Sequence, residues 1–341
     1  MSTLKVLFLS RSTLTTVPAG DTVQVLNTKK ALERLGVSVK LELQPNRWSK
    51  SYDLIHIFNT IPIQDIYPAY LWAKDSGLPI VVSPIYWDAA GWVQEIAAEP
   101  GELKRLAWWE ATQYQRREVF TGAELLLPNA YLEAKQIQKD FPGLQVKYQV
   151  VPNATEPAFA SGSAARFRRR YKIYGDFIFC SARVDPRKNQ LALIQALAGT
   201  SFQLVFAGTP GDAAYFRRFK ASLGEKNHYL GPLKPSDLAD AYAAARVHAL
   251  VSWYDTPGLA NLEAGLAGCR LVTTNRGTAQ EYLGSEAFYC DPNNLESIGT
   301  AVVQAYGSSV PKGLRTKIAQ EYTWGRVGDL TLTAYHQILN D

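Results

Sequence analysis

Short apolar runs alternate with longer amphipathic stretches along most of the chain, and no other feature of the sequence limits its fold so strongly. The runs are continuous instead of alternating with polar residues, a pattern typical of parallel strands that are buried on both faces. Strand and helix in regular alternation predict an α/β fold with doubly wound parallel sheets. The predicted strands are residues 4–9, 54–58, 79–83, 124–128, 177–182, 202–208, 229–231, 248–252 and 270–274.

The alternation pauses once, in a stretch rich in proline, alanine, serine and glycine at residues 156–165. A chain of 341 residues is long enough for two domains of roughly 100 to 200 residues each. We therefore expect two Rossmann-like domains, residues 1–155 and 156–341. Apolar residues at helical spacing predict a long helix at about 102–120 and a last helix at about 322–339.

Lysine and arginine outnumber aspartate and glutamate by 36 to 31, which gives a net charge of +5. So small an excess does not indicate a protein that coats nucleic acid, and we expect no nucleic-acid partner. Residues 1–155 hold 16 basic and 15 acidic side chains and the rest holds 20 and 16, so an anionic ligand is expected in the second half. The basic run at 166–172 is interpreted most simply as the solvated face of a helix, with contact to anionic lipid as the alternative.

Cys180, Cys269 and Cys290 are widely spaced and match neither a disulfide framework nor a zinc site, which indicates a reducing compartment. The apolar core before Arg11 is too short for a signal peptide. No later stretch approaches the ~20 apolar residues of a membrane-spanning helix. These features predict a cytoplasmic protein and leave peripheral contact with the cytoplasmic face of a membrane open. They give no indication of the oligomeric state.

Arg183 and Lys188 follow the predicted strand 177–182, on either side of a proline turn. Ligands of parallel α/β sheets bind beyond the carboxyl ends of the strands, so the loops at these ends are candidate sites. Two cations in such a loop can hold one anion, the guanidinium as a fork and the ammonium as a point charge. On spacing alone, two solvated surface charges are the simpler interpretation.

Asp255, Gly258, Leu259 and Glu263 follow the predicted strand 248–252. A helix that begins near Gly258 directs free backbone N–H groups and its positive dipole end to the strand tips, where an anion can bind. Glu263 stands beside the apolar stripe of that helix, where a carboxylate needs partners. We interpret Glu263 as a ligand of a ribose diol, and Asp255 either as a ligand of sugar hydroxyls or as a helix cap.

Further loop residues are weaker candidates. Gly208 and Gly20 each follow a strand and permit close approach of the backbone to a ligand, although chain reversal or helix capping would also explain them. Tyr86, Trp87 and Asp88 also follow a strand; aromatic rings suit stacking on sugars, and Asp88 can orient or deprotonate an acceptor hydroxyl. Core packing of Trp87 and a turn role for Asp88 explain these residues equally well.

The histidines show no metal-ligand spacing, and no cluster of His, Cys, Asp and Glu resembles a metal site, so we expect none. His56 and His248 lie in apolar strands and are predicted to be hydrogen-bonded interior residues. Neither a G-x-G-x-x-G nor a P-loop motif occurs, which removes the main support for a dinucleotide or P-loop site.

Five segments of the second half occur in an order that identifies a family: SARVDPRK (181–188), LVFAGTPGD (204–212), HYLGPLKPSDLADAYAAARV (228–247), SWYDTPGLANLEAGLAGCRLV (252–272) and TNRGTAQEYL (274–283). With them, the chain resembles the retaining glycosyltransferases of the family 4 type, which have the GT-B fold. The first half resembles the same family more loosely, through AGDTVQVLNTKKALERLGV, DLIHIFN, PIVVSPIYWD and VVPNATEP. The likeness therefore covers nearly the whole chain.

The resemblance assigns roles to residues of the second half. Arg183 and Lys188 match the pair that holds the donor diphosphate in the family. Glu263 matches the second carboxylate of its E-x₇-E motif, which binds the donor ribose. Asp255 occupies the position of the first carboxylate of this motif, which is usually a glutamate. In the family this carboxylate lies near the donor sugar.

The remaining donor residues implied by the resemblance are backbone positions. Gly20 corresponds to a glycine-rich first loop, and the backbone from Leu230 to Leu233 to the region that frames the nucleobase. Gly208, Gly258 and Leu259 complete the expected donor site.

Many members of the family carry a histidine in the loop after the strand at 79–83, whereas this chain has Ile85, Tyr86 and Asp88 there. Tyr86, Trp87 and Asp88 are therefore the acceptor candidates.

The resemblance implies that the N-terminal domain binds the acceptor, that the C-terminal domain binds a nucleotide sugar, and that the last helix packs back on the first domain. It implies transfer of a sugar from a nucleotide-diphosphate donor to a saccharide, lipid-linked or other hydroxyl acceptor in the cleft between the domains. The resemblance also implies that transfer retains the anomeric configuration. It implies that the reaction needs no metal and no cofactor apart from the nucleotide sugar, which is a co-substrate. A sugar-nucleotide epimerase and a non-catalytic binding subunit of the same fold stay open as alternatives.

Overall fold

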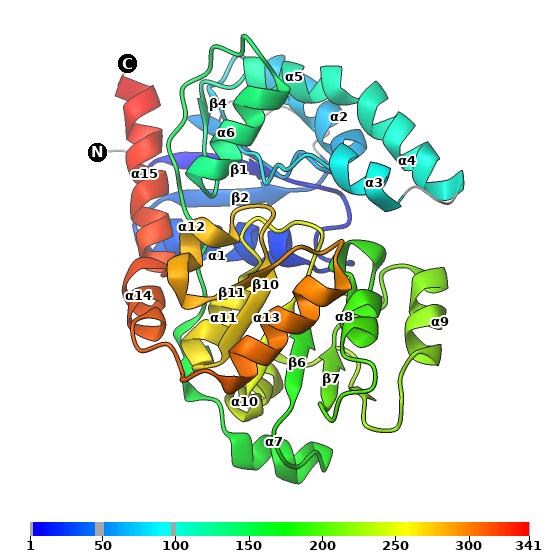
Figure 1. Cartoon of the computed structure of the whole chain (residues 1–341). Coiled ribbons are helices and arrows are strands. Elements are labelled where there is room, and N and C mark those ends of the chain that lie inside the picture. Colours follow the sequence, from blue (N-terminus) through cyan, green and yellow to red (C-terminus); the bar gives the residue numbers. More distant parts are fainter. Residues whose placement is uncertain (1–2, 45–50, 97–99, 341) are drawn as a thin grey trace. The chain divides into compact units, whose positions relative to one another are not determined.

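The computed structural model describes residues 3–44, 51–96 and 100–340, which form two α/β units (Figure 1). The first unit combines Met1–Asn153 with Trp324–Asp341, and the second is Ala154–Thr323. The expected division after residue 155 lies two residues beyond the observed one. Each unit contains one parallel sheet, so the predicted fold class is confirmed.

The sheet of the first unit is parallel throughout, and its inner strands are almost entirely buried. In spatial order its strands are β2 (Ser38–Glu42), β1 (Lys5–Leu9), β3 (Leu54–Phe58), β4 (Ile80–Ser83) and β5 (Leu125–Leu126). The sequence prediction missed β2, an edge strand in which Val39 is buried and the other residues are exposed or half-buried. Such a strand lacks the continuous apolar run by which the inner strands were predicted.

The helices of the first unit are α1 (Gly20–Arg34), α2 (Ile63–Lys74), α3 (Ala90–Ile96), α4 (Pro100–Ala111), α5 (Gln113–Thr121), α6 (Tyr131–Asp140) and α15 (Trp324–Asn340). The single helix expected at 102–120 is divided at Thr112, whose hydroxyl donates to the carbonyls of Trp108 (2.8 Å) and Trp109 (3.2 Å). Such a bond to the preceding turn competes with the regular helix ladder.

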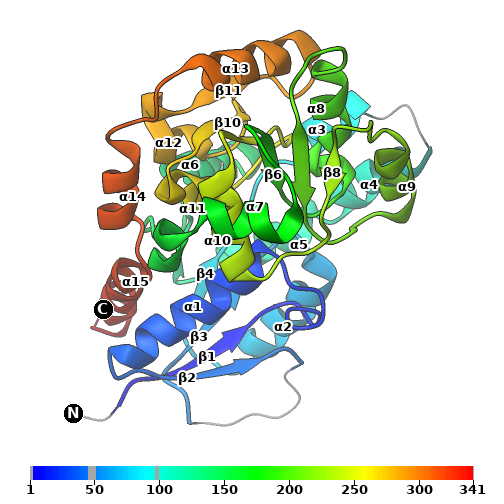
Figure 2. The same ribbon diagram turned by 90° about the horizontal axis from the view of Figure 1, so that it is seen from below.

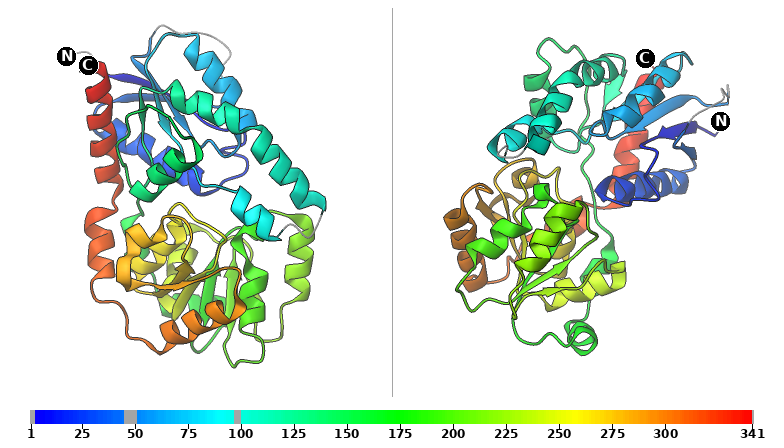
Figure 3. Two further views of the ribbon diagram at one scale, coloured as in Figure 1. Left: turned by 45° about the horizontal axis from the view of Figure 1, so that its top comes forward. Right: turned by 90° about the vertical axis from the view of Figure 1, so that its right-hand side faces the viewer.

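The C-terminal helix α15 packs against α1 (Figure 3). At their contact a Cβ atom on Gly328 would lie 2.9 Å from the Cβ of Ala31, so the two backbones approach closely only because residue 328 is glycine. Gln149 donates to the carbonyl of Leu330 at 3.0 Å and adds a polar contact. These contacts tie the end of the chain to the first unit.

The sheet of the second unit is also parallel. Its strands in spatial order are β11 (Phe288–Cys290), β10 (Arg270–Thr274), β9 (Val247–Leu250), β6 (Ile178–Ser181), β7 (Leu204–Ala207) and β8 (His228–Tyr229). The chain begins this sheet at β6, proceeds to β7 and β8 on one side, and then returns to β9 on the other. The strand order therefore reverses between β6 and β9, and such a switch point is where doubly wound sheets bind ligands.

Helices cover both faces of this sheet, with α8 and α13 on one face and α10 and α11 on the other (Figure 2). The helices of the second unit are α7 (Ala164–Tyr171), α8 (Gln190–Ala196), α9 (Ala213–Ala221), α10 (Pro235–Ala244), α11 (Leu259–Ala267), α12 (Ala279–Leu283), α13 (Leu295–Gly307) and α14 (Leu314–Glu321). Short 3₁₀ turns are η1 (Pro157–Ser161), η2 (Pro186–Lys188) and η3 (Gly284–Glu286).

The basic run at 166–172 forms most of α7, which buries Phe167 and faces α10 with one flank. Arg166 pairs with Asp240 and Arg170 with Asp237, each at 2.7 Å. Asp240 and Asp237 are buried, whereas both arginine side chains are more than half exposed. The ion pairs support the interpretation of this run as a solvated helix face.

Among the helices of the described ranges, none has both the length and the apolar composition needed to cross a lipid bilayer.

Candidate functional site

Lys188 and Asp255 meet at the switch point of the second sheet, at the tips of β6 and β9. The Lys188 ammonium lies 2.6 Å from Asp255 Oδ1, and the side chains are 12% and 6% exposed. The other carboxylate oxygen, Oδ2, is buried and accepts no hydrogen bond of regular geometry from the described residues, although the Ser252 hydroxyl is near enough to help lower the pKa of Asp255. The structure thus brings together a cation and a carboxylate that lie 67 residues apart in the sequence.

Arg183 lies in the same loop but pairs with a different carboxylate. Its Nε donates to Asp185 Oδ2 at 2.5 Å, and 42% of the side chain is exposed. Asp185 Oδ1 in turn accepts the backbone N–H of Lys188 at 3.1 Å and so caps η2. The carboxylate of Asp185 therefore fixes the loop from which both predicted cations project.

Charge and burial act in opposite directions on the pair of Lys188 and Asp255. Burial acts to raise the pKa of Asp255, but the neighbouring Lys188 and Arg187 outweigh burial and hold it below its ordinary value of 3.8. Burial and the positive charge of Arg187 lower the pKa of Lys188 below its ordinary value, although Asp255 opposes them. Asp255 is accordingly a carboxylate, not a carboxylic acid, at neutral pH.

The helix α11 begins directly after this loop. Gly258 caps it with a positive φ of 81°, and a Cβ there would lie 3.0 Å from Asn261 Nδ2 and 3.2 Å from a Leu250 methyl group. Leu259 is the first helical residue, which agrees with the predicted start near Gly258. The first-turn N–H groups of α11 consequently start at the tip of β9, where the dipole favours a negative charge.

Glu263 lies one turn further along α11 and is half-buried. The Tyr242 hydroxyl donates to its Oε2 at 3.0 Å. Burial raises the pKa of Glu263 to about 7, while the hydrogen bond from Tyr242 acts in the opposite direction. A carboxyl group with this pKa changes its charge near physiological pH.

Gly208 has a structural role that the sequence did not indicate. A Cβ on this residue, at φ 144°, would lie 1.9 Å from the carbonyl oxygen of Ala182 and 3.2 Å from the Arg183 nitrogen. The β7 and β6 loops therefore touch backbone to backbone at Gly208, and this contact supports the Arg183 loop. The backbone N–H of Leu230 donates to the Phe206 carbonyl at 2.9 Å, and this bond holds Leu230 beside β7.

Leu233 is half-buried in the segment between β8 and α10. The Gly208 N–H donates to the Gly231 carbonyl at 2.9 Å, which ties this segment to the β7 loop. Leu230 and Leu233 thus flank a backbone position that is bonded to the loop of Gly208.

In the first unit, Gly20 is the exposed first residue of α1, beside a buried charge network. Asp21 accepts two bonds from Arg11 at 2.6 and 2.9 Å and one from Asn59 at 2.7 Å. Burial acts to raise the pKa of Asp21, but Arg11 and Asn59 outweigh burial and lower it. Thr22 Oγ1 accepts the backbone N–H of Ala19 at 3.0 Å. The network fixes the start of α1 beside Gly20.

The assignment of Tyr86 to the acceptor site is wrong in this structure, because its side chain belongs to the core. The ring has no exposed surface and packs against Trp109, Phe120 and Phe141. Its hydroxyl donates to Asp140 at 2.9 Å. Burial and this neighbouring carboxylate raise the pKa of Tyr86 far above the usual range. A ring so enclosed does not stack on a sugar.

Trp87 and Asp88 differ from Tyr86 in being half-buried. Asp88 Oδ1 accepts the backbone N–H of Ala90 at 2.8 Å, at the start of α3. Asp88 therefore has the turn role that was one of its two predicted roles. Ile85, which precedes them, has a φ of 50°, an uncommon conformation for a β-branched residue. Trp87 and Asp88 stay candidates for acceptor contact.

The two strand histidines are both interior, and His56 has the better-formed hydrogen bonds. His56 lies 2.6 Å from the Tyr335 hydroxyl and 2.9 Å from the Ser83 hydroxyl, so the prediction is confirmed for this residue. For His248 the interior position is confirmed, but neither ring nitrogen forms a hydrogen bond of regular geometry within the described residues; the Asn261 side chain is its polar neighbour. Burial lowers the pKa of both to about 3. Both rings are therefore neutral at physiological pH.

Across the described ranges there is no group of three or more His, Cys, Asp or Glu side chains that could hold a metal ion.

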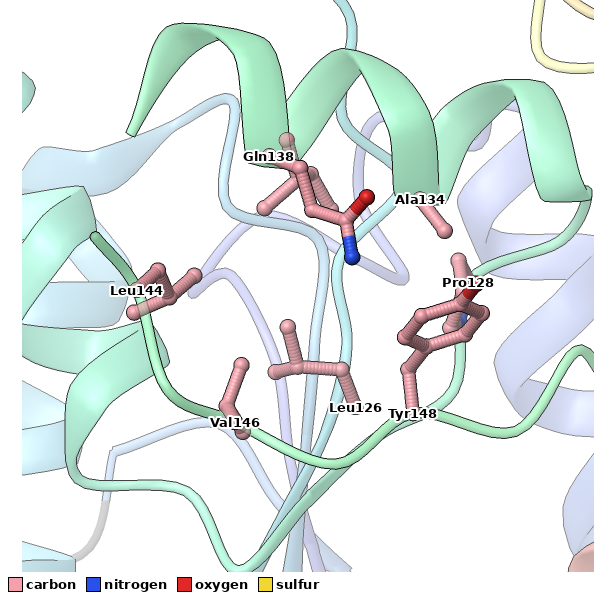
Figure 4. A pocket seen from close by; sticks show the side chains of 8 residues that line it. Leu126, Pro128, Ala134, Gln138, Leu144, Val146 and Tyr148 are labelled. Carbon is pink, nitrogen blue, oxygen red and sulfur yellow. The ribbon is translucent and has the colours of Figure 1, made fainter. Parts of the chain in front are cut away.

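A small cavity in the first unit lies between α6 and the segment that follows it (Figure 4). Its volume of about 20 Å³ suffices for a water molecule but not for a sugar ring. It is lined by Leu126, Pro128, Ala134, Ile137, Gln138, Leu144, Val146 and Tyr148, none of which is a candidate site residue. This cavity is therefore a packing feature of the unit.

Arg187 is a charged site residue that sequence reasoning missed. Its Nη1 lies 3.2 Å from Asp255 Oδ1, beside Lys188. Its position directly before Lys188 was the available signal, but adjacency in the sequence did not indicate that its side chain would reach the β9 loop.

Comparison with known proteins finds a family match that lies within the second unit. Residues 165–320 match the family described as "Glycosyl transferases group 1". The O-antigen chain mannosyltransferase B of Escherichia coli is 27% identical over 165 residues, which cover 45% of this chain and 43% of that protein. The D-inositol 3-phosphate glycosyltransferase of Acidothermus cellulolyticus is 28% identical over 250 residues, 65% of this chain and 55% of that protein.

The chain thus matches about half the length of these curated relatives. In three dimensions it is similar to sucrose-phosphate synthase of Thermosynechococcus elongatus, with a TM-score of 0.81, 16% sequence identity and 99% of both chains covered. Together with two parallel-sheet units, this likeness establishes the fold. Residues 165–320 therefore match the glycosyl transferases group 1 family, and the chain as a whole has the GT-B fold.

Proposed function

We propose that this protein is a glycosyltransferase that moves a sugar from a nucleotide-diphosphate donor to a hydroxyl group of a saccharide, a lipid-linked saccharide or another acceptor. The second unit binds the donor and the first unit binds the acceptor. The observation that carries the proposal is the meeting of Lys188 with Asp255 at the switch point of the second sheet, next to the start of α11. The match of residues 165–320 to the group 1 family supports it.

In the proposed reaction, Lys188 and Arg183 bind the diphosphate of the donor. Negative charge grows on the diphosphate as the bond to the sugar breaks, and cations placed there stabilise the transition state more than the ground state. Arg183 is 42% exposed and already projects from the same loop as Lys188. The two side chains supply positive charge without a metal ion, so we propose metal-independent transfer.

Two carboxylates are proposed to hold the sugars of the donor. Asp255 Oδ2 is a buried acceptor atom without a hydrogen bond of regular geometry from the described residues, and such an atom is stabilised when a ligand hydroxyl donates to it. We assign it to a hydroxyl of the donor sugar. Glu263 keeps Oε2 on Tyr242 and is half-buried, and we assign it to the ribose diol. Transfer with retention of configuration is part of the proposal.

The function is tested by incubating the full chain with UDP-, GDP-, ADP- and dTDP-sugars, with and without cell extracts as acceptor source, and measuring release of nucleoside diphosphate. We expect release with one class of donor, dependent on acceptor and unaffected by EDTA. Epimerised sugar nucleotide without transfer would identify an epimerase instead. Donor binding without turnover under any acceptor would identify a binding subunit.

Donor affinity is expected to increase as the pH rises from 6 to 8. Glu263, with a pKa of about 7, is largely protonated at the lower pH and ionised at the higher one. An ionised carboxylate accepts both ribose hydroxyls in charge-assisted bonds, whereas the protonated group has lost acceptor capacity. Calorimetric titration with the nucleotide sugar at several pH values measures the effect, which we expect to be about tenfold.

Glu263→Gln is expected to bind the donor about tenfold more weakly at pH 8 and to show little change with pH. Tyr242→Phe removes the one bond that lowers the pKa of Glu263, so the midpoint of the pH effect should move upward. An affinity of the unmodified protein that does not vary between pH 6 and 8 would contradict the role of Glu263.

A further inference from the structure

Arg187 lies directly before Lys188 in η2, and its side chain is bonded to the β9 loop at several points. Its Nη1 donates to the backbone carbonyl of Tyr254 at 2.7 Å and lies 3.2 Å from Asp255 Oδ1. The guanidinium carbon stands 5.1 Å from the centre of the Tyr254 ring. The backbone carbonyl of Arg187 accepts the N–H of Trp253 at 2.9 Å. Main chain and side chain of one residue thus join the β6 and β9 loops.

Two cations therefore share a single carboxylate oxygen, but they are held differently. The Lys188 ammonium has Asp255 as its only hydrogen-bond acceptor in the described part of the chain, at the end of a flexible stem. The Arg187 guanidinium is planar and is fixed by a carbonyl, a carboxylate and a ring. Lys188 can thus turn away from Asp255 without disturbing the loop, whereas Arg187 cannot.

We infer that Arg187 is a positioning residue, which holds Asp255 in place and charge-compensated while Lys188 turns from this carboxylate to the diphosphate of the donor. The inference rests on the proposed function. A buried carboxylate that loses its only cation is strongly destabilised, and the cost would oppose donor binding. Because Arg187 stays on Oδ1, Lys188 becomes available at lower cost, and Oδ2 keeps its orientation for a sugar hydroxyl.

The test measures binding of UDP, GDP, ADP and dTDP by calorimetry, in single and double variants of the full chain. Arg187→Met removes the charge and keeps most of the side-chain volume. We expect it to weaken binding of the preferred nucleoside diphosphate about tenfold, because Lys188 is then the sole counter-ion of Asp255. Arg187→Lys, which keeps the charge without the fork, is expected to restore part of the loss.

The decisive variant is the double substitution Arg187→Met with Asp255→Asn. It removes the carboxylate that competes for Lys188, so binding of the nucleoside diphosphate should return to at least the level of the unmodified protein. A residue that contacted the diphosphate itself, or that only supported the loop, would not be rescued in this way. The four proteins, including Asp255→Asn alone, form a double-mutant cycle.

Arg246 offers a matched control at the opposite end of β9. It too bonds a carboxylate (Asp176, 2.8 Å) and a backbone carbonyl (Tyr306, 2.8 Å) and stacks over a tyrosine ring (Tyr306, 4.6 Å). Arg246→Met should therefore lose similar contacts and leave nucleoside diphosphate binding unchanged. Thermal unfolding of each variant verifies that it is folded.

The outcomes separate this inference from the function on which it rests. If the unmodified protein binds none of the four nucleoside diphosphates, the proposed function and the inference both fail. If it binds one of them, but Arg187→Met binds equally well or the double variant stays weak, the inference alone is overturned. Weak binding by Arg187→Met and recovery in the double variant support it.

Discussion

Lys188→Ala is expected to reduce sugar transfer at least about a hundredfold while the protein stays folded. The Lys188 side chain is 12% exposed, and Arg187 beside it 24%. Removing a charge that stabilises a growing negative charge acts mainly on the transition state. Arg187 still compensates Asp255 in this variant, so the ion pair is weakened instead of abolished. Initial rates of nucleoside diphosphate release, measured at saturating donor, give the loss.

Two further variants show whether the loss of activity is due to the charge of Lys188. Lys188→Met keeps the apolar stem without the charge, and an equal loss in this variant would attribute the effect to charge and not to packing. Lys220→Ala removes a lysine from the exposed surface of α9 and should be as active as the unmodified protein. Normal turnover by Lys188→Ala would eliminate the diphosphate role of this residue.

Gly208→Ala is expected to destabilise the protein by about 3 kcal/mol or more, the largest stability effect that we predict. The added methyl group would lie 1.9 Å from the carbonyl oxygen of Ala182, a backbone atom that has no side-chain freedom with which to yield. Relief of this clash moves the Ala182–Arg183 backbone, and we therefore expect weaker donor binding as well. Urea unfolding followed by circular dichroism measures the stability.

Gly199→Ala provides the comparison, because Gly199 also has a positive φ, of 77°, but nothing within 4 Å of its added Cβ. This variant should cost only the conformational strain of about 1 to 2 kcal/mol. The difference between the two variants isolates the backbone clash at Gly208. Equal destabilisation would show that the contact between the β6 and β7 loops relaxes freely.

The parts of the fold that could be predicted from the sequence are those with a continuous local pattern. Inner strands such as β3 and β6 were predictable because every residue is buried and apolar or nearly so. Helix α6 was not predicted, in part because Glu133 interrupts its apolar side. That carboxylate is fully buried and accepts the backbone N–H groups of Tyr86 and Asn129, each at 2.7 Å. A buried charge with such partners cannot be distinguished in sequence from a solvated one.

In the candidate site, too, some features could be predicted from the sequence and others could not. The order of the loops and their motifs sufficed to nominate Arg183, Lys188, Asp255 and Glu263, since each lies directly after a predictable strand or at a helix start. The pattern could not show that Lys188 would pair with Asp255 and Arg183 with Asp185, nor that Arg187 would join them. Tyr86 was misassigned because a tyrosine after a strand looks the same whether its ring is buried or exposed.

By itself, the sequence determined the α/β class, the positions of most strands and the loops that could carry chemistry. It could do so because the burial of a regular strand or helix produces a short-range pattern of apolar residues along the chain. Only the tertiary structure decided which charges meet and why residue 208 must be glycine. Those outcomes depend on atoms brought together from distant parts of the chain, as with Lys188 and Asp255 across 67 residues, and no local period records them.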